Sequence, residues 1–444
     1  MNPLIDLIAG IVLSILLIWW IGNIDFFKRS SFSISSLKIA FALKIVIGFA
    51  LFLVYSFHYT TRAEADTFRY FDDSAILFNS IKSEPLDFLQ MISGIGIEND
   101  YFNTHYFSKM NNWYRSYENG LINDNRLVIR INAVIRIISF GSYHVHSVLF
   151  NFFAFIGAFE LAKLFFLISK SKWKSYLAAF LIPSFVFWSS GILKETLLIG
   201  FLGVFCYRSF LTWHKQCNLR NILLLTCCFF FLFILKVYVL LAFLPIMVWW
   251  SIKKVISNWL ISLSISFAVF FAIVVLTPRV FPDFNPLHIL VQKQHDFINL
   301  AEAFQAKSKI VIPRMEETYI SVLSSAPLGL LNTMWRPFPA DVNSFLVLLP
   351  FLENLLLLFC IFGALYSRNR LDKKQLEFMV ASLLFVFGLF IIIGVSTPVI
   401  GAIVRYKIPG LPFVFIIPLL FIDSKKVPLY IRNNRIITWL HSHL

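Results

Sequence analysis

The chain alternates between long apolar runs and short polar connections over most of its length. The runs are continuous, so they lack the alternation of apolar and polar positions that a membrane β-barrel requires. A helix of about 20 apolar residues crosses the hydrocarbon core with its backbone hydrogen bonds satisfied. The pattern therefore predicts an all-α protein, a polytopic transmembrane helical bundle. The expected spans, about eleven, are residues 3–22, 38–57, 144–168, 175–191, 192–212, 221–235, 237–251, 257–276, 343–365, 377–396 and 408–423.

Basic residues are concentrated in alternate connections between these spans. Of the 39 Lys and Arg residues, 18 lie in residues 27–38, 169–175, 214–220, 251–254 and 367–374 and in the tail from Ser424. Short loops rich in Lys and Arg are typical of the cytoplasmic side. We therefore expect the N-terminus outside and the C-terminus in the cytoplasm. The richness in Phe, Ile, Lys and Asn favours a bacterial source, and hence the inner (cytoplasmic) membrane.

The domain organisation follows from the same map. No stretch has the composition of a separate soluble domain, so residues 1–444 are expected to form a single integral membrane domain. Two connections are long, residues 58–143 and 277–342, and both fall on the outward side. The first apolar run has neither a basic start nor a small-residue cleavage site, so we expect a retained span and not a signal peptide.

Composition and charge agree with a protein that is embedded in a lipid bilayer. Hydrophobic residues make up 58% of the chain and charged residues only 14%. The net charge of +15 follows from the loop bias, so it does not indicate a nucleic-acid partner. Neither long outward connection contains a cysteine, and no CxxC motif or histidine cluster indicates a metal site.

An acidic cluster follows the second expected span, in the stretch TTRAEADTFRYFDDSAILFNSI (60–81). Apolar residues recur at helical spacing after Asp66, which predicts an amphipathic helix at the membrane interface. One interpretation is that Asp66 caps this helix and that the later acids face water. The other is a general base at the membrane surface, where an acceptor hydroxyl and a lipid-linked donor can meet. The charged candidates in this stretch are Glu64, Asp66, Arg69, Asp72 and Asp73.

Cations also lie at the outward ends of later spans, although short outward loops are normally poor in Lys and Arg. Each alone is explained by snorkelling, and the neighbouring aromatic residues by anchoring at the interface. Together they favour a site for a phosphate or pyrophosphate at headgroup level. The candidate binding residues are Lys194 and Glu195, Lys236 and Tyr238, Arg336, and Arg405, Tyr406 and Lys407.

Carboxylates and cations on one outward face suit a transferase whose donor is a sugar carried on a polyprenyl phosphate. The carboxylate would remove the proton of the acceptor hydroxyl, while Arg and Lys would stabilise the phosphate as it leaves. Nucleotide sugars are made in the cytoplasm, so an outward site requires a lipid-linked donor. The acceptor is expected to be a glycan or another lipid-linked molecule.

The motif Glu64-Ala65-Asp66, in the first long outward connection, resembles the acidic ExD or DxD motif of the C-type (GT-C) membrane glycosyltransferases. The blocks RYFDDS, FWSSGILKE, WRPFP and VRYKIPGLPF are similar to bacterial membrane proteins of surface-polysaccharide and cell-wall glycan assembly. The resemblance implies that Asp66 is the catalytic base and that Glu64 supports it. It leaves open whether the two share Mg²⁺ or Mn²⁺, because the family includes metal-independent members. The acidic loop follows the second span here and the first span in the family.

Two other functions fit part of the pattern. A polysaccharide polymerase or ligase of the O-antigen type moves a whole glycan from a polyprenyl pyrophosphate, and would depend on outward arginines such as Arg336 and Arg405. A lipid-linked oligosaccharide transporter or flippase would use polar or broken spans near the midplane. Glu353 in the ninth span favours transport, whereas the clustering of polar residues at one surface argues against it.

Overall fold

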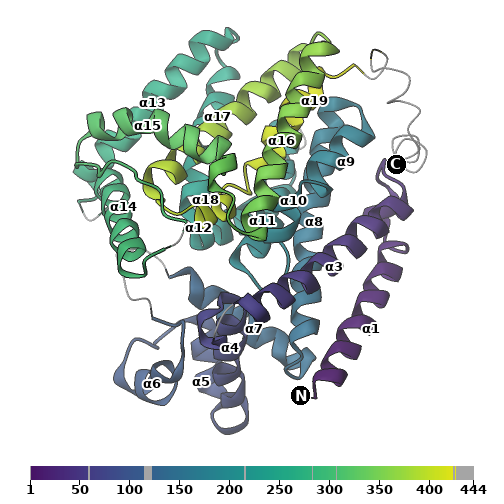
Figure 1. The fold of residues 1–444 in the computed structure, drawn as a ribbon, viewed down its shortest axis with the longest axis vertical. Coiled ribbons are helices and arrows are strands. Elements are labelled where there is room, and N and C mark those ends of the chain that lie inside the picture. Colours follow the sequence, from purple (N-terminus) through teal and green to yellow (C-terminus); the bar gives the residue numbers. More distant parts are fainter. Residues whose placement is uncertain are drawn as a thin grey trace.

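The computed structural model describes residues 2–58, 61–114, 123–214, 217–282, 284–306, 308–423 and 426. This part of the chain is built from helices, with only isolated backbone bridges besides (Figure 1). Several of the helices are long and apolar enough to cross a membrane. The predicted all-α, multi-pass membrane fold is therefore confirmed. The predicted cytoplasmic tail from Ser424 lies outside the described residues, apart from Lys426.

Eight helices of the described chain meet the length and hydropathy expected of a span, and a ninth span is counted if the bent pair α18 and α19 forms one. The predicted number of about eleven is not confirmed. The eight are α1 (Pro3–Ile21), α3 (Ile34–His58), α8 (Tyr143–Ser169), α11 (Lys194–Trp213), α12 (Leu219–Lys253), α13 (Trp259–Val280), α16 (Phe345–Tyr366) and α17 (Lys373–Ser396). The bent pair is α18 (Ile400–Tyr406) and α19 (Leu411–Phe421), with an angle of 67° between them.

The fourth expected span, residues 175–191, is replaced by two short helices, α9 (Lys172–Phe180) and α10 (Pro183–Trp188). Pro183 stands at the first helical position of α10, where its missing N–H leaves no hydrogen bond unmade. The buried carboxylate of Glu353 accepts a hydrogen bond of 2.7 Å from the backbone N–H of Ser184. Oε2 of Glu353 thus contacts the start of α10, whereas its buried Oε1 has no hydrogen-bond partner among the described residues.

The sixth and seventh expected spans lie within α12, which is interrupted at Lys236 by a non-helical backbone (φ −155°, ψ 82°). Contacts along α11 run in opposite directions on the two sides of this residue. They are Phe231 with Phe201 and Asn221 with Arg208 before Lys236, and Phe243 with Phe205 and Trp250 with Trp213 after it. The first half of α12 is therefore antiparallel to α11 and the second half parallel. Both ends of α12 lie near the C-terminal end of α11, and Lys236 lies at the bend.

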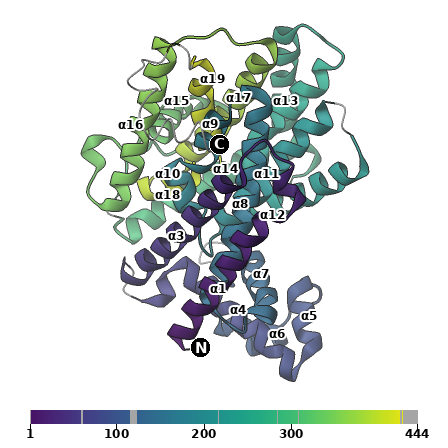
Figure 2. The ribbon, with the colours of Figure 1, turned by 90° about the vertical axis from the view of Figure 1, so that its right-hand side faces the viewer.

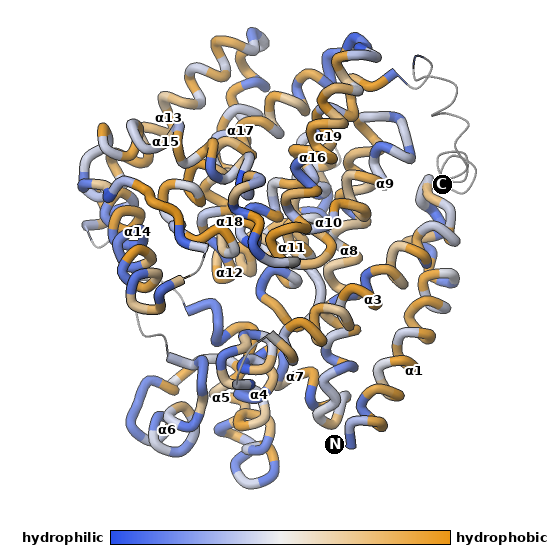
Figure 3. Tube along the Cα trace, viewed as in Figure 1, coloured by the Kyte–Doolittle hydropathy of each residue, from blue (hydrophilic) through white to orange (hydrophobic). Residues whose placement is uncertain are grey.

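Residues 58–143 contain a set of short helices that gather at one end of the molecule, next to the start of α1 (Figures 1 and 2). Figure 3 shows hydrophilic residues concentrated there, whereas the long helices are mainly hydrophobic. Buried Trp113, Met91 and Ile129 belong to a core that this domain shares with the adjoining ends of the spans. The position of its helices at a membrane interface stays a prediction. The elements are η1 (Arg62–Glu64), α4 (Asp66–Ser83), α5 (Pro85–Ser93), α6 (Asp100–His105), η2 (Phe107–Lys109) and α7 (Asp124–Ser139).

The second long connection, residues 277–342, contains α14 (Pro286–Ala303), α15 (Tyr319–Trp335) and η3 (Pro339–Asp341). Helix α15 packs tightly against the span α17. A Cβ atom placed on Gly394 would lie 1.9 Å from the carbonyl oxygen of Gly329, so only glycine allows this approach. Thr333 Oγ1 also donates a hydrogen bond of 2.9 Å to the carbonyl oxygen of Phe390. Part of this connection therefore lies alongside a span.

The centre of the bundle is the pair α8 and α11. A Cβ atom on Gly203 would lie 1.9 Å from the carbonyl oxygen of Gly157, so the two backbones are in direct contact. Phe155 and Phe159 of α8 are fully buried and contact Phe27. The closely packed pair fixes the direction of α11, whose first residues are Lys194 and Glu195.

Candidate active site between the helical domain and the bundle

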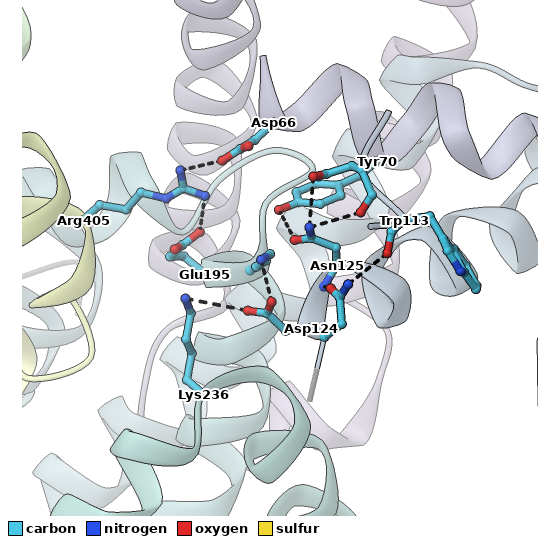
Figure 4. A network of polar contacts seen from close by, with 11 residues as sticks. Asp66, Tyr70, Trp113, Asp124, Asn125, Glu195, Lys236 and Arg405 are labelled. Carbon is cyan, nitrogen blue, oxygen red and sulfur yellow. Dashed lines mark hydrogen bonds and ion pairs between the residues drawn. The ribbon is translucent and has the colours of Figure 1, made fainter. Parts of the chain in front are cut away.

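Arg405 joins two carboxylates that are distant in the sequence. One terminal nitrogen of its guanidinium lies 2.9 Å from Asp66 Oδ2, and the other lies 2.9 Å from Glu195 Oε2 (Figure 4). Asp66 begins α4 of the helical domain, Glu195 lies in the first turn of α11, and Arg405 lies in the last turn of α18. The helical domain is therefore attached to the bundle through a shared, charge-assisted hydrogen-bond pair.

A third carboxylate, Asp124, lies beside this bridge. Its Oδ1 accepts a hydrogen bond of 2.7 Å from Lys194 Nζ, and its Oδ2 lies 3.7 Å from Lys236 Nζ (Figure 4). Asp124 is the first residue of α7, and Lys236 is at the bend of α12. Five helices thus bring three carboxylates and three cations to one place.

The network is largely removed from water, with one more open side. The side chain of Glu195 is 2% exposed, whereas that of Asp66 keeps 34% of its surface. Arg405 Nε is buried, and no acceptor of the described residues bonds to it. Charges attract more strongly in such a low-dielectric region than at the surface, and the three cations balance the three carboxylates, so no charge is buried without an opposite charge beside it. The exposed edge of Asp66 is the place at which a ligand can add a contact, whereas the unpaired Nε donor of Arg405 is covered by the surrounding side chains.

The ionisation of Asp66 is set by its neighbours. Burial opposes the charged form of the carboxyl group, but the charges of Arg405 and Lys194 and the hydrogen bond from Arg405 outweigh it. The pKa of Asp66 therefore lies below its ordinary value. Asp66 is a carboxylate in this state, as a group that accepts a proton must be.

Aromatic rings surround the cations. The ammonium of Lys236 lies 4.8 Å from the ring centre of Tyr406 and 5.9 Å from that of Tyr238, and Lys194 lies 5.7 Å from that of Tyr70. Such cation–π contacts moderately stabilise a charged group in a site that is partly removed from water. The Tyr hydroxyls also bring hydrogen-bonding groups to the same region.

The loop before α11 is fixed from two sides. Lys44 of α3 is buried and donates hydrogen bonds to the carbonyl oxygen (2.6 Å) and the hydroxyl (2.8 Å) of Ser189. Asn151 of α8 accepts a hydrogen bond of 2.8 Å from the backbone N–H of Gly191, whose positive φ of 73° suits glycine. The polar residues of the FWSSGILKE block thus present Lys194 and Glu195 in a defined position.

The predicted site residues divide into two groups. Those that the fold brings together are Asp66, Lys194, Glu195, Lys236, Tyr238, Arg405 and Tyr406. Those whose contacts lie elsewhere are Glu64, Arg69, Asp72, Asp73, Arg336 and Lys407. Asp66 is also not the cap of α4. Ala65 holds the N-cap position, and no side-chain capping hydrogen bond is made there.

The remaining acids of the RYFDDS block serve the helical domain itself. Asp72 forms an exposed ion pair of 2.6 Å with Arg62. Asp73 is buried and accepts backbone hydrogen bonds of 2.9 Å from Asn111 and 2.7 Å from Asn112. Burial raises the pKa of Asp73, although these two hydrogen bonds oppose the rise.

Glu64 and Arg69 lie at the start of the same domain. Glu64 is exposed in the short helix η1. Arg69 Nε donates a hydrogen bond to the carbonyl oxygen of Ala63 and so holds the turn before α4. The hydrogen bond of Arg69 therefore stabilises the local backbone.

Arg336 and Lys407 form a separate polar group. Arg336 donates hydrogen bonds to Asp341 (2.7 Å) and to Asn332 (3.0 Å) near the end of α15. The buried ammonium of Lys407 donates to the carbonyl oxygen of Arg336 at 3.1 Å. These two cations therefore support the segment that connects α15 to α16.

Sequence reasoning did not single out Asp124, Asn125 or Tyr70. Tyr70 donates a hydrogen bond of 3.2 Å to the amide oxygen of Asn125, whose NH2 group bonds to Asn112 O (3.1 Å) and Oδ1 (2.9 Å). An acid at the start of a helical run is a common N-terminal signal, so Asp124 had an ordinary explanation in the sequence. Nothing in the sequence indicated that it contacts two lysines.

The carboxylates do not form a divalent-cation site of the usual kind. The described residues contain no group of three or more His, Cys, Asp or Glu side chains that is arranged to hold a metal ion. Glu64 lies in η1, whereas the carboxylate of Asp66 is bound to Arg405. These residues do not fit Mg²⁺ or Mn²⁺ shared between Glu64 and Asp66, and we derive no step through such an ion.

Comparison of the chain with family models, with curated proteins and with solved structures gives no match.

Proposed function

We propose that this protein is a membrane glycosyltransferase that uses a polyprenyl-phosphate-linked sugar at the extracytoplasmic face, in bacterial cell-surface glycan assembly. The bridge from Arg405 to Asp66 and Glu195 carries the proposal, because it joins a carboxylate base to a phosphate-binding cation. Lys194 and Lys236 lie beside the bridge and add positive charge. The resemblance of Glu64-Ala65-Asp66 to the C-type glycosyltransferase motif points to the same chemistry.

The chemistry follows from an exchange of partners. Phosphate oxygens of the donor replace a carboxylate as partner of Arg405, which frees Asp66 while the guanidinium stays charge-balanced. The acceptor hydroxyl oxygen then forms a bond to the anomeric carbon, and the bond from that carbon to the phosphate oxygen breaks. Asp66 takes the hydroxyl proton. Arg405 and Lys236 hold the polyprenyl phosphate as it leaves with the bonding electrons.

A polymerase or ligase is the second candidate, because one of its two expected arginines, Arg405, lies at the centre of the network. The other, Arg336, is bound to Asp341 instead. Transport has one observation in its favour, the buried Glu353, of which one oxygen accepts a hydrogen bond from Ser184 and the other has no hydrogen-bond partner among the described residues.

The test is transfer of a radiolabelled sugar from a set of polyprenyl-phosphate donors by the purified protein in bilayers. Asp66→Asn removes the base and keeps the shape, so we expect transfer to fall by about 10²- to 10⁴-fold with donor binding retained. Asp100→Asn is the matched control, because Asp100 is an exposed acid of the same domain and its loss should leave transfer unchanged.

The outcomes separate the candidates. Loss of transfer in Asp66→Asn but not in Asp100→Asn supports the glycosyltransferase. A polymerase or ligase predicts that Asp66→Asn is tolerated better than Arg405→Lys, with a polyprenyl-pyrophosphate glycan as the donor. If the wild-type protein binds no lipid phosphate in this assay, the enzyme proposal is wrong.

A further inference from the structure

A second cluster of cations lies at the opposite end of α11 from the candidate active site. Helix α11 runs from Lys194 to Trp213, which is about 28 Å at about 1.5 Å per residue. At its far end, the last turns of α11 and α12 meet the first turn of α17 around a cavity of about 210 Å³. None of the residues that line this cavity belongs to the site described above.

The charge of the cavity is unbalanced. Lys253 is paired with Glu377 at 2.5 Å. Lys254 and Lys374 also line the cavity and are exposed, and no ion pair joins them to a carboxylate of the described residues. Three lysines against one glutamate give the cavity a net charge of +2. The structure thus leaves two ammonium groups at its rim that an anion can bind.

Aromatic rings form the rest of the wall. Trp213 and Trp250 stack with their ring centres 5.6 Å apart, and the ammonium of Lys254 lies 4.0 Å from the ring centre of Trp213. Trp at the ends of membrane spans lies at headgroup depth, where one edge is apolar and the other is wet. The combination of Lys and Trp at this position therefore suits a ligand with an anionic head and an apolar body.

We propose that this cavity binds the phosphate headgroup of an anionic phospholipid from the adjacent leaflet. Its volume is below the roughly 300 Å³ of a site for a drug-sized ligand, so it holds a headgroup while the acyl chains stay in the bilayer. Basic pockets between membrane helices are known receptors for anionic headgroups. In the predicted orientation, this end of the bundle faces the cytoplasm.

The experiment measures binding of radiolabelled phosphatidylglycerol and phosphatidylcholine to the purified full chain, with inorganic phosphate as a competitor. Each lysine near an anionic headgroup contributes about fivefold in affinity, so Lys254→Gln with Lys374→Gln is expected to weaken phosphatidylglycerol binding roughly 25-fold. Lys254→Arg with Lys374→Arg should retain the binding of phosphatidylglycerol. The matched control is Lys172→Gln with Arg370→Gln, which removes two exposed cations outside the cavity and should have no effect.

Preference for phosphatidylglycerol over phosphatidylcholine, lost only in the cavity variant, supports the proposal. Equal binding of the two lipids, or an unchanged affinity in the cavity variant, overturns it. Full displacement by millimolar inorganic phosphate also overturns it, because the ligand is then a soluble phosphate. This measurement does not depend on sugar transfer. The lipid-binding proposal can therefore fail while the glycosyltransferase proposal holds, and the reverse.

Discussion

At the scale of single residues, Arg405 is the centre of the candidate site. It is 17% exposed and bonds to Glu195, which is buried, and to Asp66, which is partly open to solvent. A planar guanidinium can serve two acceptors at fixed angles, whereas the ammonium of a lysine is a single point charge. The identity of this one side chain therefore decides whether α4 and α11 share a partner.

Replacing Arg405 should destabilise the folded protein. Arg405→Gln leaves the carboxylate of Glu195 buried without its cation, and loss of one partner of a buried pair costs about 3–5 kcal/mol. The part of the loss that comes from Asp66 is smaller, because Asp66 is more exposed. We expect a lower unfolding temperature in detergent. Adding Glu195→Gln should restore part of it, and a wild-type unfolding temperature for Arg405→Gln alone would show that the bridge contributes nothing.

The Asp66 pair should also make stability depend on pH. The pKa of Asp66 is lowered from 3.8, so the ion pair contributes fully above that value and is lost as the pH falls through the lower folded-state pKa. We expect the wild type to unfold at a higher temperature than Asp66→Asn near neutral pH, and the difference to shrink below about pH 4. Thermal unfolding of both proteins from pH 3 to pH 7 measures this. A difference that stays constant over this range contradicts the assignment.

At the scale of helices, glycine contacts and helix breaks position the site. Gly157 and Gly203 let α8 and α11 touch, and the bend at Lys236 turns α12 so that its cation meets Asp124. Both features depend on the backbone. The contact between α8 and α11 requires residues without a side chain, and the bend of α12 requires a residue with non-helical backbone angles. The cations at helix ends are thus positioned by how the helices pack.

The contact between α8 and α11 gives a direct test. Gly203→Ala places a methyl group 1.9 Å from the carbonyl oxygen of Gly157, so the helices must move apart. Overpacking of this kind costs about 1–3 kcal/mol, and the unfolding temperature should fall. Gly401→Ala is the control, because nothing lies within 4 Å of the added methyl group. Similar unfolding temperatures for the two variants would mean that the close approach is not required.

At the scale of the whole molecule, the helical domain contacts the first turn of α11 through Asp124, whereas the cavity lies at the other end of the same helix. Helix α11 is long and apolar enough to cross a membrane, so we expect its two ends to face different compartments. The loop charges predict that the helical domain is outside.

Cysteine labelling tests this orientation. Cys217 is a native exposed cysteine in the connection between α11 and α12. We expect a membrane-impermeant maleimide to label Cys217 only after the membrane is opened. Asp100→Cys in a Cys217→Ser background should instead react in intact cells. Reversed labelling would place the helical domain, and the candidate active site, in the cytoplasm.

Much of the topology was predictable from the sequence, because burial of apolar side chains in lipid leaves continuous hydrophobic runs. The ends of α1, α8 and α13 lie within a few residues of the predicted spans. The predicted number of about eleven spans is not confirmed, since hydropathy does not distinguish a helix that crosses from one that breaks. Pro183 begins the second of two short helices that replace one expected span, whereas the bend at Lys236 lies where the sequence predicted the turn between the sixth and seventh spans.

The sequence by itself determined which groups are present. They are the apolar helices of a bundle, the cations expected at outward helix ends, and an acidic stretch after the second span. Only the tertiary structure decided which of these groups meet. It joined Asp66 and Glu195 through Arg405, added Asp124, and left Arg336 with Asp341. The reason is physical: helix formation and membrane insertion depend on local composition, whereas the pairing of charges depends on the packing of helices far apart in the chain.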